Sequence, residues 1–129
     1  MLKQIIKNLL LYFKNKKKGV VSYTPYISLK TSIGTNTTIE NNSQIDEYTN
    51  IGENVYIGRN CYLTKVDIGN YCSIANNVSI GQGEHNLDNI STSSLFYNEA
   101  YSELTKKDCI LGNDVWIGVD SIILRGVTI

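Results

Sequence analysis

The sequence predicts an all-β fold of short parallel strands, because a six-residue repeat runs from Ile33 to Gln82. An aliphatic residue opens each step, and the series slips by one residue before it resumes at Ile68. The aliphatic positions are Ile33, Ile39, Ile45, Ile51, Ile57, Leu63, Ile68, Ile74 and Ile80. A period of six does not fit an amphipathic helix, which needs apolar spacings of three and four, but it is a multiple of the strand period of two.

A second regularity supports the same fold: a small or β-branched residue follows most of the aliphatic residues by four positions. These residues are Thr37, Ser43, Thr49, Val55, Cys61, Cys72 and Val78. Both positions have the same parity along a strand, so they are expected to face inward together while the residues between them face solvent. Hexapeptide repeats are typical of β-solenoids, in which three steps close one coil of about eighteen residues. A β-sandwich with accidental spacing is the alternative.

The repeat resumes near the end of the chain at Leu111, Ile117 and Ile123. Gly and Asn residues near the steps are expected at corners, where positive φ angles are needed. Residues 83–109 interrupt the repeat and read GEHNLDNISTSSLFYNEAYSELTKKDC. An excursion of this length from a compact solenoid predicts a functional loop, and a short helical turn is expected within residues 101–107.

Residues 2–14 are predicted to form an amphipathic helix. Its apolar face consists of Leu2, Ile5, Ile6, Leu9, Leu10 and Phe13, and its polar face of Lys3, Lys7 and Lys14. Solenoids need caps because a bare strand edge invites aggregation, so we expect this helix to dock on the first coil and cover its open end. The alternative is an interfacial helix that lies on an anionic membrane.

The charge of the chain is balanced overall but divided along its length. Residues 1–18 hold six of the twelve basic residues and no acidic one, which leaves residues 19–129 with a net charge of minus six. The basic residues of this second part form no run, so we do not expect it to bind nucleic acid. The sequence thus divides into a basic N-terminal helix, residues 1–18, and a solenoid domain, residues 19–129, with a loop at about 83–109.

The three cysteines fit no zinc-binding pattern, and Cys61 and Cys72 occupy inward positions of the repeat. They are expected to be buried and inert, in a reducing cytoplasm. The sequence contains neither a long apolar span nor a signal-peptide pattern. Zinc-dependent hydration on a solenoid needs three histidines, and the chain has one, so no metal is expected.

That single histidine, His85, is the strongest candidate for catalysis, because imidazole titrates near neutral pH and can take a proton from a hydroxyl group. It lies at the base of the predicted loop. A lone histidine is more often structural, so the surrounding sequence decides. Three strings are informative: GEHN at 83–86, STSSLFY at 91–97 and GNDVWIG at 112–118.

Together with the repeat, these strings resemble the left-handed β-helix hexapeptide acyltransferases, in particular the xenobiotic and polysaccharide O-acetyltransferase branch. The resemblance covers roughly residues 21–129. It implies a left-handed parallel β-helix with a short N-terminal α-helix and one long loop inserted between coils. It also implies a homotrimer with clefts between subunits, in which His85 is the general base that lets an acceptor hydroxyl attack the thioester of acetyl-CoA.

The resemblance also implies roles for residues around His85. Trp116 and Gly118 are expected beside the acetyl-CoA site. The acceptor-binding residues are expected to be Asn86, Asp88, Phe96 and Tyr97, although the two aromatic residues could instead anchor the loop. Glu84, Asp88 or a backbone carbonyl could orient the second ring nitrogen of His85, and a backbone N–H group of a Gly-containing coil would stabilise the oxyanion.

The function expected from this resemblance is acetylation of a sugar hydroxyl on a surface polysaccharide or its precursor. The alternatives are acetylation of an antibiotic such as chloramphenicol or a streptogramin, and a truncated, inactive β-helix that only serves assembly. Members of the family continue for further coils beyond the position of Ile129, so a C-terminally truncated chain with weak binding of CoA is expected. The expected location is the cytoplasm, with peripheral membrane contact through residues 1–18 as a variant.

Overall fold

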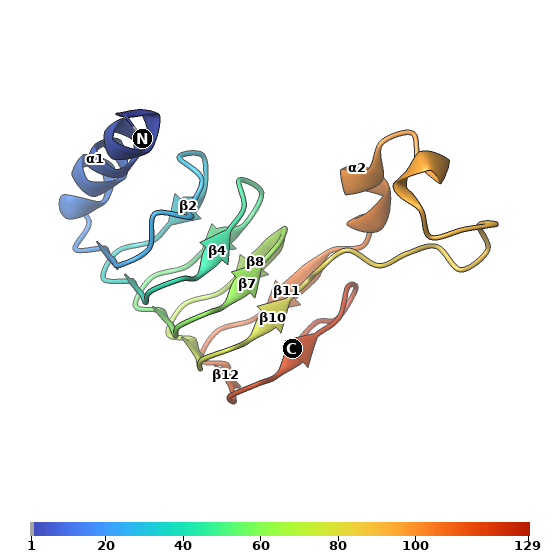
Figure 1. Ribbon diagram of the computed structural model, residues 1–129. Coiled ribbons are helices and arrows are strands. Elements are labelled where there is room, and N and C mark those ends of the chain that lie inside the picture. The colour runs from blue at the N-terminus through green and yellow to red at the C-terminus, as the bar shows by residue number, and fades with distance from the viewer. Residues whose placement is uncertain (1) are drawn as a thin grey trace.

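A computed structural model describes residues 2–129 (Figure 1). The chain starts with helix α1 (Leu2–Lys16), continues through ten short strands and then forms a long loop. The strands before the loop are β1 (Val21–Ser22), β2 (Ser32–Ile33), β3 (Thr38–Ile39), β4 (Gln44–Ile45), β5 (Asn50–Ile51), β6 (Tyr56–Ile57), β7 (Tyr62–Leu63), β8 (Val66–Ile68), β9 (Ser73–Ile74) and β10 (Ser79–Ile80). The loop contains the 3₁₀ turn η1 (Ser94–Phe96) and helix α2 (Ala100–Leu104), and it is followed by β11 (Cys109–Leu111), β12 (Trp116–Ile117) and β13 (Ile122–Ile123).

The strands form three parallel sheets, and each coil contributes one strand to each sheet. The orders are β1-β3-β6-β9-β12, β13-β10-β7-β4 and β11-β8-β5-β2. Partners such as Ile39 and Ile57 lie one eighteen-residue coil apart. The register continues across the loop, because Cys109 pairs with Val66 on the preceding coil. This arrangement is the left-handed parallel β-helix that the sequence predicts, although its first strand, at Val21, lies earlier than the first clear step of the repeat.

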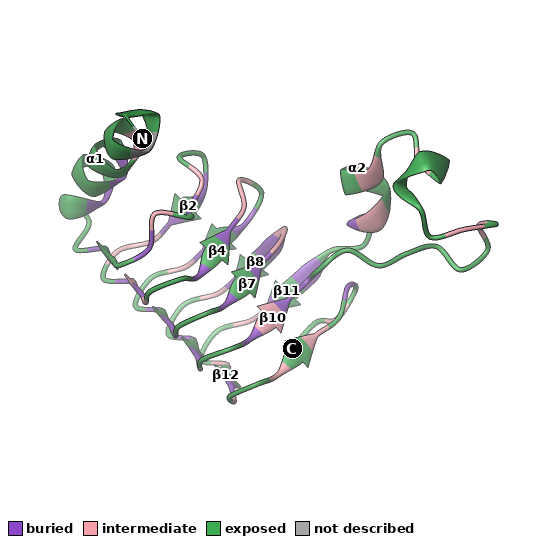
Figure 2. Cartoon of the chain, viewed as in Figure 1, coloured by how far each residue is buried: buried purple, intermediate pink, exposed green. Residues whose placement is uncertain are grey.

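The core is the interior of the coils, where the aliphatic residues of successive steps stack on one another (Figure 2). Ile39, Ile57 and Ile74 are completely buried, and each such side chain contributes about 1.5–3 kcal/mol on burial. The small residues at the fourth offset also face inward, as predicted. In the first coils they carry hydroxyls, and Ser43 Oγ donates to the carbonyl oxygen of Gly58 on the next coil at 2.7 Å. This hydrogen bond satisfies a polar group that would otherwise be costly to bury.

The corners use Asn more often than Gly for the positive φ angles that the sequence suggested. Positive φ angles are found at Asn36, Asn42, Asn54, Asn60 and Asn77. Gly34 does not have a positive φ and is needed for a different reason. A Cβ atom on Gly34 would lie 2.5 Å from the carbonyl carbon of Gly52 on the next coil, so only glycine allows the coils to stack this closely.

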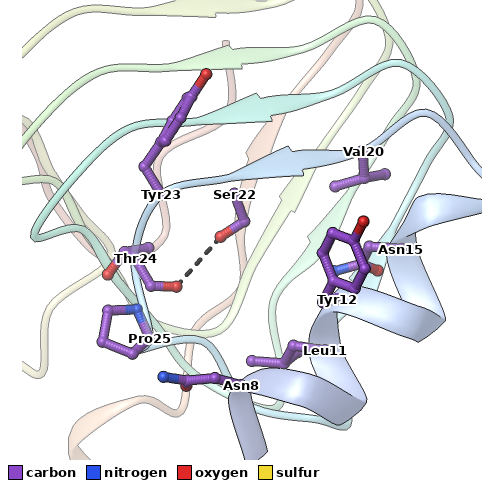
Figure 3. A pocket seen from close by; sticks show the side chains of 9 residues that line it. All are labelled: Asn8, Leu11, Tyr12, Asn15, Val20, Ser22, Tyr23, Thr24 and Pro25. Carbon is purple, nitrogen blue, oxygen red and sulfur yellow. Dashed lines mark hydrogen bonds between the residues drawn. The ribbon is translucent and has the colours of Figure 1, made fainter. Parts of the chain in front are cut away.

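Helix α1 lies across the first coil, as the cap interpretation expects, but it docks through a different face (Figures 1 and 3). Leu11 and Asn15 are its buried residues, and a hollow of about 320 Å³ remains between the helix and the first coil. The Lys14 ammonium group donates to the carbonyl oxygens of Leu29 and Thr31, at 2.7 and 3.1 Å. The predicted apolar face is exposed to solvent. Within residues 2–129, no helix combines the length and the hydrophobicity that a membrane span requires.

Candidate active site

The loop leaves the solenoid after β10, projects away from the coils and returns to β11 through η1 and α2 (Figure 1). The backbone turns outward at Gly81, whose φ of 65° favours glycine. The outgoing and returning legs are joined by a hydrogen bond in which the Glu84 N–H donates to the Leu104 carbonyl oxygen at 2.9 Å. The base of the loop is therefore a defined structure, and His85 lies on it.

His85 is exposed, and its ring is held by Tyr97. The Nδ1 atom of His85 lies 3.2 Å from the Tyr97 hydroxyl oxygen, which also accepts a hydrogen bond from the Asn86 N–H at 3.2 Å. The sequence left Glu84, Asp88 or a backbone carbonyl as the group that orients His85, and the contact is made by Tyr97 instead. Among residues 2–129, the second ring nitrogen, Nε2, has no hydrogen-bond partner.

A cleft of about 330 Å³ lies beside His85, between the two legs of the loop and the last coil. Its lining residues are Glu84, His85, Asn86, Leu87, Asp88, Glu103, Leu104, Lys106, Lys107 and Arg125. The structure thus brings together three residues that the sequence singled out: His85, Asn86 and Asp88. Phe96 does not line this cleft and is about half exposed.

Trp116 and Gly118 lie elsewhere on the chain. Trp116 is on β12, where it pairs with Ser73, whereas His85 follows β10 on a different sheet. The indole is 79% exposed, and nothing lies within 4 Å of the position where Gly118 would carry a Cβ atom. A single chain therefore does not bring these two residues to His85.

Arg125 is a residue of the cleft that the sequence did not indicate. Its side chain is buried, and its guanidinium group donates to the carbonyl oxygens of Lys65 and Lys107, at 2.8 and 3.2 Å, and to that of Thr64. These bonds tie the returning leg of the loop to two coils. Arg125 occupies the same corner of the solenoid as Lys65. An alignment of the repeats could have placed it at that corner, but it could not have shown that the side chain is buried.

Tyr101 anchors the outer part of the loop to the solenoid. Its hydroxyl donates to Asp46 Oδ2 at 2.6 Å, and its ring centroid lies 5.2 Å from that of Tyr48. Burial raises the pKa of Tyr101, and the hydrogen bond to Asp46 raises it further. Asp46 also accepts a hydrogen bond from the backbone N–H of Lys65, at 3.0 Å. The carboxylate therefore links the loop to the second and third coils.

Catalysis by a cysteine nucleophile or by a metal ion finds less support in the described residues. Cys61, Cys72 and Cys109 are free and buried, and burial raises the pKa of the Cys61 and Cys109 thiols, which disfavours the nucleophilic thiolate. Within residues 2–129, no group of three His, Cys, Asp or Glu side chains is arranged to hold a metal ion. The hollow beneath α1 is lined by no acidic residue and no histidine. His85 and its cleft are the better candidate site.

Comparison with known proteins agrees with the fold. Residues 36–64 and 48–82 match the family described as bacterial transferase hexapeptide (six repeats). Over 73 residues the chain is 36% identical to a chloramphenicol acetyltransferase from Agrobacterium fabrum (strain C58). That match covers 48% of this chain and 35% of the enzyme, so the chain spans about a third of the length of this relative.

Two solved structures have the same architecture. A mutant of AntD, an N-acyltransferase from Bacillus cereus, in complex with dTDP and coenzyme A is 25% identical, with a TM-score of 0.53, and the match covers 91% of this chain and 71% of AntD. A second AntD mutant with the same ligands gives 21% identity and a TM-score of 0.51, with 92% and 70% covered. The chain thus shares the six-residue repeat of bacterial hexapeptide transferases over residues 36–82 and the three-sided solenoid architecture of AntD.

Proposed function

We propose that this protein transfers the acetyl group of acetyl-CoA to a hydroxyl group of a sugar, on a surface polysaccharide or its precursor, with His85 as general base. The observation that carries the proposal is the hydrogen bond that holds the His85 ring at the edge of the cleft. The use of an acyl-CoA is supported by the coenzyme A bound to AntD. A sugar acceptor is supported by the polar lining beside His85, since Asn86 and Asp88 can accept hydrogen bonds from hydroxyl groups.

The contact between His85 and Tyr97 is compatible with a role of His85 as general base. A phenol oxygen has two lone pairs, so Tyr97 can accept one hydrogen bond from the Asn86 N–H and a second from the His85 Nδ1–H. In that tautomer Nε2 carries the free lone pair and can take the proton of the acceptor hydroxyl. In this proposal a neutral partner, rather than a carboxylate, sets the tautomer of His85.

The reaction then proceeds by direct transfer. As Nε2 of His85 takes the hydroxyl proton, the acceptor oxygen attacks the thioester carbonyl and forms a tetrahedral oxyanion, which a backbone N–H group would stabilise. When the oxyanion collapses, the C–S bond breaks and the sulfur of CoA takes the proton from His85. The acceptor leaves as an acetyl ester and His85 returns to its neutral form.

We further propose that the complete site lies between subunits of a homotrimer in the cytoplasm. The separation of Trp116 and Gly118 from His85 in one chain supports this, because a neighbouring subunit could supply them to the open side of the cleft. There Trp116 and Gly118 would contact acetyl-CoA, while Phe96 on the exposed loop would face the acceptor. Sedimentation of a monomer at micromolar concentration would contradict this arrangement.

The test is the release of CoA thiol from acetyl-CoA, measured with a panel of sugar acceptors for the wild type and for His85→Ala. We expect the variant to be slower by roughly a hundredfold or more. Its stability should not change, because His85 is exposed. The matched control is Asn98→Ala, an exposed position in the same loop, which should keep the wild-type rate. Equal rates for His85→Ala and the wild type would contradict the role of His85.

A second candidate function is acetylation of an antibiotic, which the 36% identity to a chloramphenicol acetyltransferase supports. Chloramphenicol therefore belongs in the acceptor panel, and turnover of chloramphenicol without turnover of any sugar would favour this alternative. If no acceptor is turned over and calorimetry detects no binding of acetyl-CoA, an inactive assembly module is the better explanation.

A further inference from the structure

Helix α1 has two opposite faces, and the solenoid uses only one of them. Successive residues of an α-helix are rotated by about 100°, so Leu9 and Phe13 point to the side opposite Leu11 and Asn15. Leu11 and Asn15 are buried against the first coil. The other side, which we call the outer face, consists of Leu2, Ile5, Ile6, Leu9, Leu10 and Phe13. Its six side chains are 48–70% exposed, so the most apolar surface of the helix points away from the protein.

The outer face is flanked by positive charge. Residues 1–18 contain six lysines and no acidic residue. Lys14 and Lys18 are engaged in hydrogen bonds with carbonyl oxygens of the coil beneath the helix. Lys3, however, lies at one edge of the outer face on the helical wheel, Lys16 lies within its angular range, and both are exposed. The ammonium group of Lys16 lies 5.4 Å from the centroid of the Tyr12 ring, near the C-terminal end of the helix.

The apolar side chains and the neighbouring lysines together indicate which kind of partner the outer face can bind. A second copy of the helix would bring two sets of lysines together, and neither helix has a carboxylate to offset them. An uncharged apolar partner would leave the lysines without a counter-charge. A bilayer with anionic headgroups provides apolar acyl chains for the leucine, isoleucine and phenylalanine side chains and negative charge for the lysines beside them.

We propose that α1 docks this protein on anionic membrane surfaces, with the outer face inserted at the headgroup boundary and Lys3 and Lys16 against the lipid phosphates. The helix would serve both purposes that the sequence left as alternatives, since one face caps the solenoid and the opposite face binds lipid. Figure 1 places α1 at one end of the stack of coils, whereas the loop with His85 leaves near the other end. Docking would therefore leave the cleft open. This inference does not depend on the proposed reaction.

The test is co-sedimentation of the full chain with vesicles of phosphatidylglycerol and phosphatidylcholine at low salt, compared with vesicles of phosphatidylcholine alone. We expect the wild type to bind the anionic vesicles, and added salt to weaken the binding. The double variant Leu9→Gln/Phe13→Gln should lower the partition coefficient at least tenfold, because it removes apolar side chains from the inserted face. A matched control, Ile90→Gln/Leu95→Gln, changes two exposed apolar residues of the loop and should bind as the wild type does.

The variant Lys3→Gln/Lys16→Gln tests the electrostatic part separately and should lower the partition coefficient by on the order of tenfold. It leaves the docked residues Leu11 and Asn15 unchanged, so its result does not depend on whether the more disruptive apolar variant folds. Equal binding to neutral and anionic vesicles, or no binding of the wild type, would overturn the proposal. Self-association without lipid that Leu9→Gln/Phe13→Gln abolishes, with no vesicle binding, would assign the outer face to a second copy.

Discussion

The coils and the loop hold their shapes by different means. In the coils, each step from Ile27 to Ile117 buries an aliphatic side chain, and parallel hydrogen bonds repeat this arrangement from coil to coil. Among residues 82–108, all of which the structure describes, Thr105 alone is buried, and Figure 2 shows the loop as mostly exposed. Side chains such as Tyr97, Tyr101 and Arg125 fix the loop instead. The comparison teaches that stability and catalysis should respond to changes in different residues.

The largest effect on stability is expected inside a coil. Ile74 is completely buried on β9, and Ile74→Ala should lower the free energy of unfolding by about 2–5 kcal/mol because it leaves a cavity. The matched control is Ser73→Ala on the same strand, where the side chain is exposed, and it should change the value by less than about 0.5 kcal/mol. Urea unfolding followed by circular dichroism measures both. Similar values for the two variants would contradict the inward assignment of the repeat.

A smaller effect, on catalysis alone, is expected at Tyr97 in the loop. Tyr97→Phe removes the hydroxyl that contacts Nδ1 of His85, so the ring loses its orientation while its chemistry remains. We expect kcat to fall by roughly tenfold, with the KM for acetyl-CoA and the thermal midpoint unchanged. Tyr71→Phe, at an exposed ring on a solenoid corner, is the control. A rise in KM at constant kcat would show that Tyr97 binds substrate rather than positions His85.

The smallest effect is expected where the loop meets the coils. Tyr101→Phe removes the hydrogen bond to Asp46 and should lower the free energy of unfolding by about 1 kcal/mol. The pKa of Tyr101 is raised in the folded protein, so its contribution is fully present below the ordinary tyrosine value of about 10.

The same tyrosine predicts a pH dependence. As the pH rises above about 10, the unfolded chain ionises its phenol while the folded chain keeps the proton, and stability falls. The difference in stability between the wild type and Tyr101→Phe should therefore shrink across this range. Denaturation curves at pH 8 to 11 would measure this, and a constant difference would contradict the proposed contact.

The solenoid could be predicted from the sequence because every coil has the same pattern of inward-facing positions. A residue such as Ile57 is buried for the same reason as Ile39 one coil earlier, so the repeat itself encodes the fold. The hand of the helix came only from the family resemblance, since a spacing of six has no hand. Docking of α1 through Leu11 and Asn15 was missed because apolar area suggested the opposite face. The first coil presents carbonyl groups such as that of Leu29, and the donor Lys14 therefore turns toward it.

The site was predictable only in part. His85, Asn86 and Asp88 are close together in the sequence, and the structure places all three at the cleft. The contact between His85 and Tyr97 depends on how the whole loop folds back, and a loop without a period gives no signal for it. The burial of Arg125 was equally hidden, because its partners are backbone carbonyl oxygens rather than acidic side chains.

The register across the loop has a consequence for how such solenoids can change. At one corner the chain needs only Thr64 and Lys65 between strands β7 and β8, whereas residues 81–108 fill the equivalent gap before β11. Strand β11 nevertheless pairs with β8 in unbroken register. Each doubling of loop length adds only about 0.6 kcal/mol of closure entropy. A loop of different length or sequence can therefore be inserted or removed at this corner while the strand pairing of the coils that follow keeps its register.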